Sequence, residues 1–204
     1  MTRHIHPTAY IAPDAVLGDN ITVDPFAVIE SGVELGDNCH IGAHAVVQCY
    51  VKMGSGNVLH PHAVLGGLPQ DTSFKAETVS WLLVGDNNTF REGFTAHRAS
   101  KEQGETRIAS NCYFMNNSHV AHDCKVGSNT IFANNVAIGG HVEVGLARFG
   151  TQSHQVFASE AEVAAPAAEV IAHHFFREMI VAGWHRGMRR KHDVRGDGFE
   201  GGGI

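Results

Sequence analysis

The feature that most constrains this chain is an aliphatic residue at every sixth position. From residue 5 to residue 65, all eleven residues at this spacing are Ile, Leu, Val or Met: Ile5, Ile11, Leu17, Val23, Ile29, Leu35, Ile41, Val47, Met53, Leu59 and Leu65. A helix repeats every 3.6 residues and a simple strand every two, so neither explains a strict repeat of six. The repeat predicts short strands joined by corners, with one side chain of each hexad directed to a central axis.

Three hexads would close one triangular coil of eighteen residues. Successive coils would pair their strands in parallel, about 4.8 Å apart. We therefore predict an all-β chain built as a parallel β-helix, whose hand the repeat does not determine. Glycines follow several of the aliphatic positions, and we expect them to serve as backbone bends: Gly18, Gly36, Gly42, Gly54 and Gly66.

Two segments interrupt the repeat. Residues 67–83 contain proline, polar and aromatic residues, and residues 98–107 are rich in charged and polar residues, so we predict an extruded loop at each. The repeat resumes after each segment and is lost beyond Gly145. We therefore predict a β-helix domain over residues 1–145.

The last part of the chain, residues 146–204, has a different character. Residues 164–182 favour a helix that stops at Gly183. The glycine-rich end after that helix is expected to be disordered. We predict an atypical tail that is short, partly helical and partly disordered.

Composition excludes several classes of function. The formal net charge of −6 argues against a general nucleic-acid binder, which normally carries a basic face. No apolar stretch reaches the roughly 18–20 residues needed to span a membrane, and the N-terminus lacks the apolar core of a secretory signal. The four cysteines form no C-x-x-C pair, which favours reduced thiols. We predict a cytoplasmic protein with no nucleic-acid partner and no membrane span.

The best candidates for chemistry are His119, His122 and Asp123, which lie outside the inward position taken by Val120. Because one coil takes eighteen residues, His122 would lie beside Gly140, and Asp123 beside His141. An imidazole close to a glycine N–H suits a general base next to an oxyanion donor. Asp123 would orient the imidazole, whose ordinary pKa of about 6.5 suits proton abstraction near neutrality.

Other interpretations of the histidines stay open. The chain has 15 histidines, and six of them are predicted to be surface or corner residues: His4, His6, His40, His44, His60 and His62. His119 and His141 also allow a zinc site, because neutral imidazole is a common zinc ligand. No nucleophile elbow or nucleotide-binding glycine pattern is present, and we interpret Cys112 and Cys124 as packing residues. Direct attack by a substrate hydroxyl is therefore favoured over a covalent enzyme intermediate.

Six motifs occur in order along the first 145 residues: HPTA (6–9), LGGLPQD (65–71), VGDNNTFRE (84–92), AHR (96–98), NNSHVAHDC (116–124) and FANNVAIGGHVEVG (132–145). In these motifs the chain resembles the acyl-[acyl-carrier-protein]–UDP-N-acetylglucosamine O-acyltransferase family, which begins lipid A biosynthesis. The resemblance implies a left-handed β-helix, a homotrimer and active sites between subunits. It also implies transfer of a hydroxyacyl group from acyl carrier protein to the 3-hydroxyl of UDP-N-acetylglucosamine.

The resemblance further implies roles for single residues. His122 would be the general base, Asp123 its support, and the Gly140 N–H the oxyanion donor. The residues implied to contact substrate are Asp71, Lys75, His97, His119, Asn134 and His141. Neither a metal nor a dissociable cofactor is implied, because the carrier-protein thioester supplies the acyl group.

The chain departs from the family pattern after Gly145, where later coils and a helical domain would follow. We interpret the chain as a C-terminally truncated or altered member, and we expect the altered ending to weaken its activity. Two alternatives stay open. One is a degenerate, non-catalytic β-helix protein of the same family, and the other is a related nucleotide-sugar N-acyltransferase.

Overall fold

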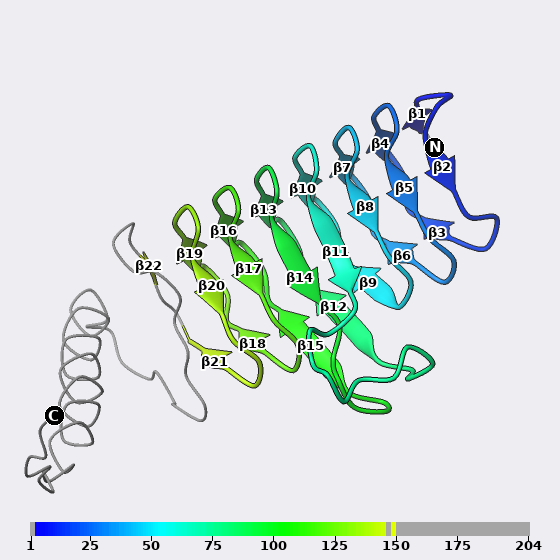
Figure 1. Cartoon of the computed structure of the whole chain (residues 1–204). Helices are drawn as coiled ribbons and strands as arrows, with labels where there is room; N and C mark the ends of the chain where they lie inside the picture. Colours follow the sequence, from blue (N-terminus) through cyan, green and yellow to red (C-terminus); the bar gives the residue numbers. More distant parts are fainter. Residues whose placement is uncertain (1–2, 146–147, 150–204) are drawn as a thin grey trace, which may run out of the picture. The chain divides into compact units, whose positions relative to one another are not determined.

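The computed structural model describes residues 3–145 and 148–149. The chain divides into two units at residue 169, and every described residue lies in the first unit. The described residues form a left-handed parallel β-helix, whose short strands wind from coil to coil about a common axis (Figure 1). The fold class predicted from the six-residue repeat is confirmed.

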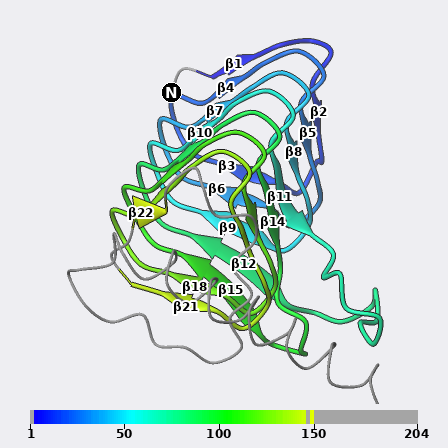
Figure 2. The ribbon, with the colours of Figure 1, turned by 60° about the vertical axis from the view of Figure 1, so that its left-hand side comes forward.

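The strands of the described residues form three parallel sheets, and each coil contributes one strand to each sheet (Figure 2). Sheet A contains β1 (His4–Ile5), β4 (Thr22–Val23), β7 (His40–Ile41), β10 (Val58–Leu59), β13 (Thr89–Phe90), β16 (Tyr113–Phe114), β19 (Ile131–Phe132) and β22 (Arg148–Phe149). Sheet B contains β2 (Tyr10–Ile11), β5 (Val28–Ile29), β8 (Val46–Val47), β11 (Val64–Gly67), β14 (Thr95–His97), β17 (His119–Val120) and β20 (Ala137–Ile138). Sheet C contains β3 (Val16–Leu17), β6 (Glu34–Leu35), β9 (Val51–Met53), β12 (Trp81–Val84), β15 (Glu105–Ile108), β18 (Lys125–Val126) and β21 (Glu143–Val144).

The register between coils stacks each inward residue on another. In sheet A, for example, Ile5 pairs with Val23, and Val23 pairs with Ile41. From Leu17 onward the predicted aliphatic positions are buried, which forms the core along the axis. Ile5 is 42% exposed because its coil is the first of the described coils and is covered on one side only.

Aromatic side chains fill the middle of the core. Phe90 stacks on Phe114 with ring centroids 5.2 Å apart, and Phe94 lies 4.8 Å from the Phe114 ring. In this coil the inward residue of sheet B is Ala96, which is buried. The aliphatic repeat did not predict it, because the repeat consists of the larger residues Ile, Leu, Val and Met. Phe94, two residues earlier, is fully buried and fills the space that a small residue leaves.

Most corners from Leu17 onward have a left-handed backbone three residues after the inward residue. Positive φ angles occur there at Gly, at Asn and at a few other residues, including His44 (φ 58), Asp123 (φ 58) and His141 (φ 63). Asn, Asp and His adopt this conformation more readily than most residues that carry a side chain. The corner positions of His44 and His62 agree with the prediction made for them.

The glycines that directly follow the inward residues do not act as predicted. Gly18, Gly36, Gly42 and Gly54 have no positive φ, and only Gly66 does (φ 85). A Cβ added to Gly36 would lie 2.6 Å from the carbonyl carbon of Gly54 in the next coil. These glycines therefore let neighbouring coils approach closely, and their interpretation as bends was wrong at four of the five positions.

Two loops leave the coil at the corner between sheets B and C. The first covers residues 68–80 between β11 and β12, and the second covers residues 98–104 between β14 and β15. Both are shorter than the predicted 67–83 and 98–107, because their ends form strands, as in the pairing of Trp81 with Glu105. The longer loop extends away from the stacked coils in both views (Figures 1 and 2).

Strand pairing continues beyond the predicted domain end at residue 145. Phe149 in β22 pairs with Phe132 in β19, one position earlier than a strict six-residue repeat would place it. The predicted helix at 164–182 and the predicted disordered end lie outside the described residues. Within the described part of the chain, no helix has the length and apolar character needed to cross a membrane.

Replacing Gly36 by alanine should lower the free energy of unfolding by about 3 kcal/mol, because the new Cβ meets backbone atoms that cannot move aside easily. Gly32→Ala is the matched control. Gly32 has φ +69, and a Cβ added there would meet no atom within 4 Å. Its replacement by alanine should therefore cost only about 1 kcal/mol, the penalty for a side chain in the left-handed conformation. Chemical denaturation of both variants checks this prediction, and a smaller loss at Gly36 than at Gly32 would contradict it.

Candidate active site

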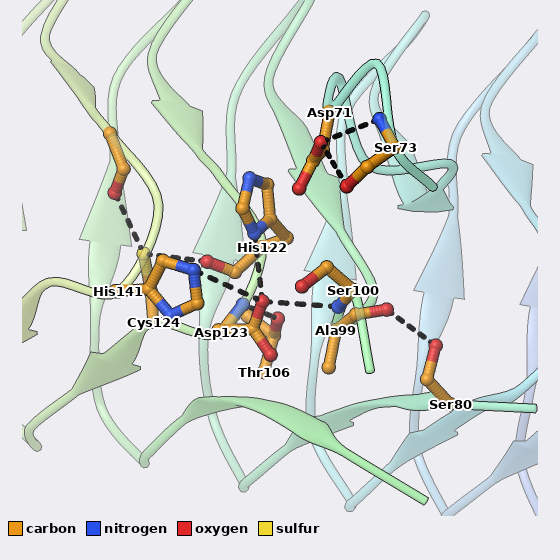
Figure 3. A network of polar contacts seen from close by, with 11 residues as sticks. Asp71, Ser73, Ser80, Ala99, Ser100, Thr106, His122, Asp123, Cys124 and His141 are labelled. Carbon is orange, nitrogen blue, oxygen red and sulfur yellow. Dashed lines mark hydrogen bonds and ion pairs between the residues drawn. The ribbon is translucent and has the colours of Figure 1, made fainter. Parts of the chain in front are cut away.

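Four segments that are distant in sequence meet at the corner between sheets B and C, which we call the BC corner. Two are the extruded loops, residues 68–80 and 98–104. The other two are the turns that follow β17 and β20, residues 121–124 and 139–142. Figure 3 shows polar side chains from these segments directed toward one another.

A histidine–carboxylate pair occupies this corner. His122 Nδ1 lies 2.8 Å from Asp123 Oδ2, and both side chains are only 14% exposed. A carboxylate can only accept, so the imidazole donates its Nδ1–H and its Nε2 keeps a basic lone pair. The pair thus has the arrangement of an oriented general base.

Gly140 lies directly against the imidazole, as the eighteen-residue coil predicts. A Cβ added to Gly140 would lie 2.5 Å from His122 Cε1 and 2.8 Å from Nε2. Only a residue without a side chain therefore leaves this face of the imidazole open. The Gly140 N–H makes no hydrogen bond with any residue in the described ranges, and its role as an oxyanion donor stays a prediction.

Asp123 is held both at its carboxylate and at its backbone N–H. The backbone N–H of Ser100, in the shorter loop, donates to Asp123 Oδ2 at 3.1 Å, and the Asp123 N–H donates to Thr106 Oγ1 at 2.8 Å. Burial raises the pKa of Asp123, but hydrogen bonds from Ser100 and His122 outweigh it and leave the pKa below its usual value. The carboxylate is therefore ionised at neutral pH.

His141 completes the corner on the open side. Its ring meets the His122 ring edge to face with centroids 5.2 Å apart, and its Nε2 lies 3.8 Å from Asp123 Oδ2. His122, Asp123 and His141 could together hold a metal ion, since one ligand atom from each lies within 4.8 Å of the others. Asp123 Oδ2, however, already accepts hydrogen bonds from His122 and Ser100, which a metal would have to displace.

Asp71 reaches the corner from the longer loop and lies beside His122 in Figure 3. Its Oδ1 accepts hydrogen bonds from the N–H and the hydroxyl of Ser73, both at 2.8 Å. These two bonds lower the pKa of Asp71, and charge on His122 and His141 lowers it further. Lys75 is exposed on the same loop, and its contact with substrate stays a prediction.

His97 and His119 form a second pair behind His122. Their rings meet at 71° with centroids 4.6 Å apart, and His119 Nδ1 lies 2.7 Å from Thr95 Oγ1. His97 is only 7% exposed, and its Nδ1 has no partner among the described residues. Burial lowers the pKa of both, that of His97 to about 4, with further lowering by the neighbouring histidines. Both rings are therefore neutral at pH 7.

One predicted substrate residue lies elsewhere. Asn134 follows β19 in the turn between sheets A and B, so a single chain does not bring it to the BC corner. The sequence analysis also missed Ser100, Thr106 and Arg98. Of these three, only Arg98 stands in one of the six motifs, AHR.

Comparisons with known proteins first define the class of protein. A family model described as bacterial transferase hexapeptide (six repeats) matches residues 14–49, 32–67 and 105–145. These ranges contain the coil, the turn with His122 and Asp123, and the turn with Gly140 and His141. The fold is thus that of the hexapeptide-repeat transferases.

Individual relatives narrow the class to a family. An acyl-[acyl-carrier-protein]–UDP-N-acetylglucosamine O-acyltransferase of Anaeromyxobacter dehalogenans is 55% identical over 139 residues, which is 68% of this chain and 54% of the relative. The solved UDP-N-acetylglucosamine acyltransferase of Bacteroides fragilis is 31% identical, covers 94% of this chain and 86% of its own, and gives a TM-score of 0.57. The solved acyltransferase of Acinetobacter baumannii is 38% identical, and the match covers 68% of this chain and 54% of that one, with a TM-score of 0.66. The chain belongs to the UDP-N-acetylglucosamine O-acyltransferase family.

The match to the curated relatives is partial in one respect. The chain spans about half the length of the curated relatives it matches, between 53% and 56%. The match to the Xylella fastidiosa relative spans 71% of this chain and therefore has to include His122, Asp123 and Gly140.

His97→Gln should make the free energy of unfolding less sensitive to acid. Between pH 6.5 and 4 the unfolded chain binds more protons at residue 97 than the folded protein, whose His97 pKa is lowered to about 4. Stability therefore falls as the pH falls, by up to about 3 kcal/mol from this residue alone. Urea denaturation at several pH values measures the slope, and an unchanged slope in the variant would contradict the prediction.

Proposed function

We propose that this chain transfers a hydroxyacyl group from the thioester of an acyl carrier protein to the 3-hydroxyl of UDP-N-acetylglucosamine, the first step of lipid A biosynthesis. The observation that carries the proposal is the His122–Asp123 pair, held against Gly140 where two extruded loops meet. Membership of the family supports the same reaction, because the matching relatives are named for it. The reaction would take place in the cytoplasm.

In the proposed mechanism, Asp123 fixes the orientation of His122. Nε2 of His122 removes the proton of the sugar hydroxyl while the hydroxyl oxygen attacks the thioester carbonyl carbon. The negative charge that forms on the carbonyl oxygen would be stabilised by the Gly140 N–H. The tetrahedral intermediate then expels the carrier-protein thiolate, which takes the proton from the imidazolium. The ester, the free thiol and neutral His122 remain.

The residues around the base would bind the nucleotide sugar and the acyl chain. Asp71 and Lys75 would contact the sugar nucleotide from the longer loop, and His141 from the open side of the corner. His97 and His119, both neutral and largely buried, offer uncharged donors and acceptors behind the base. No metal or dissociable cofactor takes part in this proposal.

A second copy of the chain would complete the site. The outward residues of sheet B are apolar in the first coils: Tyr10, Val28, Val46 and Val64. Sheet C instead exposes ion pairs, such as Lys52 with Glu34 at 2.8 Å. An apolar sheet face of this kind favours packing against another copy. We propose a homotrimer in which Asn134, for the acyl chain, comes from the neighbouring subunit.

Sedimentation equilibrium should give three times the mass of 22.0 kDa, about 66 kDa. Val46→Glu should dissociate the assembly, because it places a charge in the middle of the apolar face while the inward side of β8 is unchanged. Lys52→Glu on sheet C is the matched control and should leave the mass unchanged. A monomeric wild-type chain would contradict the proposal.

Incubation with hydroxyacyl-carrier protein and UDP-N-acetylglucosamine, in the presence of a chelator, should yield acylated sugar detectable by mass spectrometry. His122→Ala should lower turnover by about 10³-fold, because it removes the base. Gly140→Ala should also lower turnover, because its Cβ displaces the imidazole. His40→Ala, an exposed histidine on sheet A, is the control and should keep full activity.

The outcomes of this assay distinguish the proposed function from its alternatives. No product above the His122→Ala background would indicate the non-catalytic alternative, and equal activity of wild type and variant would mean that the base is misassigned. Acylation of an amino sugar, but not of UDP-N-acetylglucosamine, would indicate the N-acyltransferase. Loss of activity on chelation would contradict a mechanism without metal.

A further inference from the structure

Arg98 is an unusual buried residue. Its side chain is only 1% exposed, although a guanidinium carries a full positive charge at neutral pH. Among the described residues no carboxylate forms an ion pair with it. Burying an unpaired charge is costly, so other contacts must compensate for the loss of water.

The compensating contacts come largely from the loop of residues 68–80. Arg98 Nη1 donates to the carbonyl oxygen of Thr78 at 2.5 Å and to Ser80 Oγ at 3.4 Å, and Nη2 donates to the carbonyl oxygen of Ala76 at 3.2 Å. The guanidinium also lies 5.2 Å from the ring centroid of Phe74, on the same loop. A loop carbonyl bonded to a charged donor is held more strongly than one bonded to a neutral donor.

The other contacts of Arg98 join it to the coil. Its carbon Cζ lies 4.8 Å from the ring centroid of Tyr50, so the guanidinium has one ring from the coil and one from the loop beside it. The Arg98 N–H donates to the Gly67 carbonyl oxygen at 3.0 Å, where the loop begins. At the end of the loop, Ser80 Oγ donates to the Ala99 carbonyl oxygen at 2.5 Å (Figure 3). Residues 98 and 99 therefore contact both ends of the loop.

We propose that Arg98 is a positioning residue, which fastens the loop of residues 68–80 to the coil and so holds Asp71 beside His122. Asp71 has its own local support from Ser73, but that bond lies within the loop and does not connect it to the coil. Without the guanidinium, the segment from Phe74 to Ser80 loses three hydrogen bonds to the coil and keeps those that Val79 and Ser80 make with the shorter loop. The attachment of the loop by Arg98 does not depend on the proposed function. Only the effect of this attachment on binding of the nucleotide sugar rests on that function.

A protease that cleaves after lysine tests the attachment without any substrate. Lys75 is exposed and directly precedes Ala76, whose carbonyl Arg98 holds. Arg98→Gln should accelerate cleavage after Lys75 about tenfold, because local opening of the loop becomes easier. Arg107→Gln, which removes an exposed arginine from sheet C, is the matched control and should cleave at the wild-type rate.

Kinetics separate positioning from a general loss of structure. Arg98→Gln should raise the KM for UDP-N-acetylglucosamine about tenfold and change kcat less than about threefold, because the base itself is untouched. Arg98→Lys keeps the charge but not the planar fork, and should recover part of both the KM and the resistance to cleavage. A tenfold fall in kcat with an unchanged KM would overturn the proposal.

Phe74→Ala covers the case in which Arg98→Gln does not fold. Phe74 lies on the loop, so its removal weakens the attachment and leaves the coil intact. It should accelerate cleavage after Lys75 by about threefold. Wild-type cleavage rates in both Arg98→Gln and Phe74→Ala would overturn the proposal. An inactive wild-type chain would refute the proposed function, whereas the cleavage rates would still decide the role of Arg98.

Discussion

The hydrogen bonds between successive coils determine where every functional group of this chain can lie. Each strand donates its N–H groups to the carbonyl groups of the next coil, as Gly36 does to Met53 at 2.8 Å. Residues eighteen apart are therefore stacked. The exposed rings of Phe26, His44 and His62 show this stacking, with centroids 5.0 Å apart at each step. The contact between His122 and Gly140 is another case of the same register.

The two loops add residues without disturbing this register in sheet A, whereas in sheet B it shifts by one residue between Leu65 and Gly67, where the longer loop leaves the coil. Leu59 pairs with Phe90 and Phe90 with Phe114, although these partners are 31 and 24 residues apart instead of eighteen. Because both loops leave at the BC corner, they add Asp71 and Ser100 beside a turn that the regular coil already supplies. The coil thus provides the base and its close glycine, and the loops provide the groups that support and surround them.

Much of this arrangement could be predicted from the sequence, because the inward residues recur at a fixed spacing that is visible along the chain. The aliphatic positions and the neighbourhood of His122 and Gly140 followed from it directly. Ala96 could not be predicted, since a small inward residue with a compensating Phe94 breaks the aliphatic pattern. Ser100, Thr106 and Arg98 act through hydroxyl, backbone and carbonyl contacts that only the folded loops create. The resemblance assigned Asn134 a role without saying which copy of the chain supplies it.

The left-handed corners impose a limit on how this site can change over evolutionary time. Asp123 and His141 both occupy corner positions with positive φ, at 58° and 63°. Of the two acidic amino acids, only aspartate is well tolerated in such a conformation, and β-branched residues are strongly disfavoured. Drift at these two positions is therefore restricted by the backbone as well as by chemistry. A lineage that lost catalysis would still be expected to avoid β-branched residues there, as all the described non-glycine residues with positive φ do.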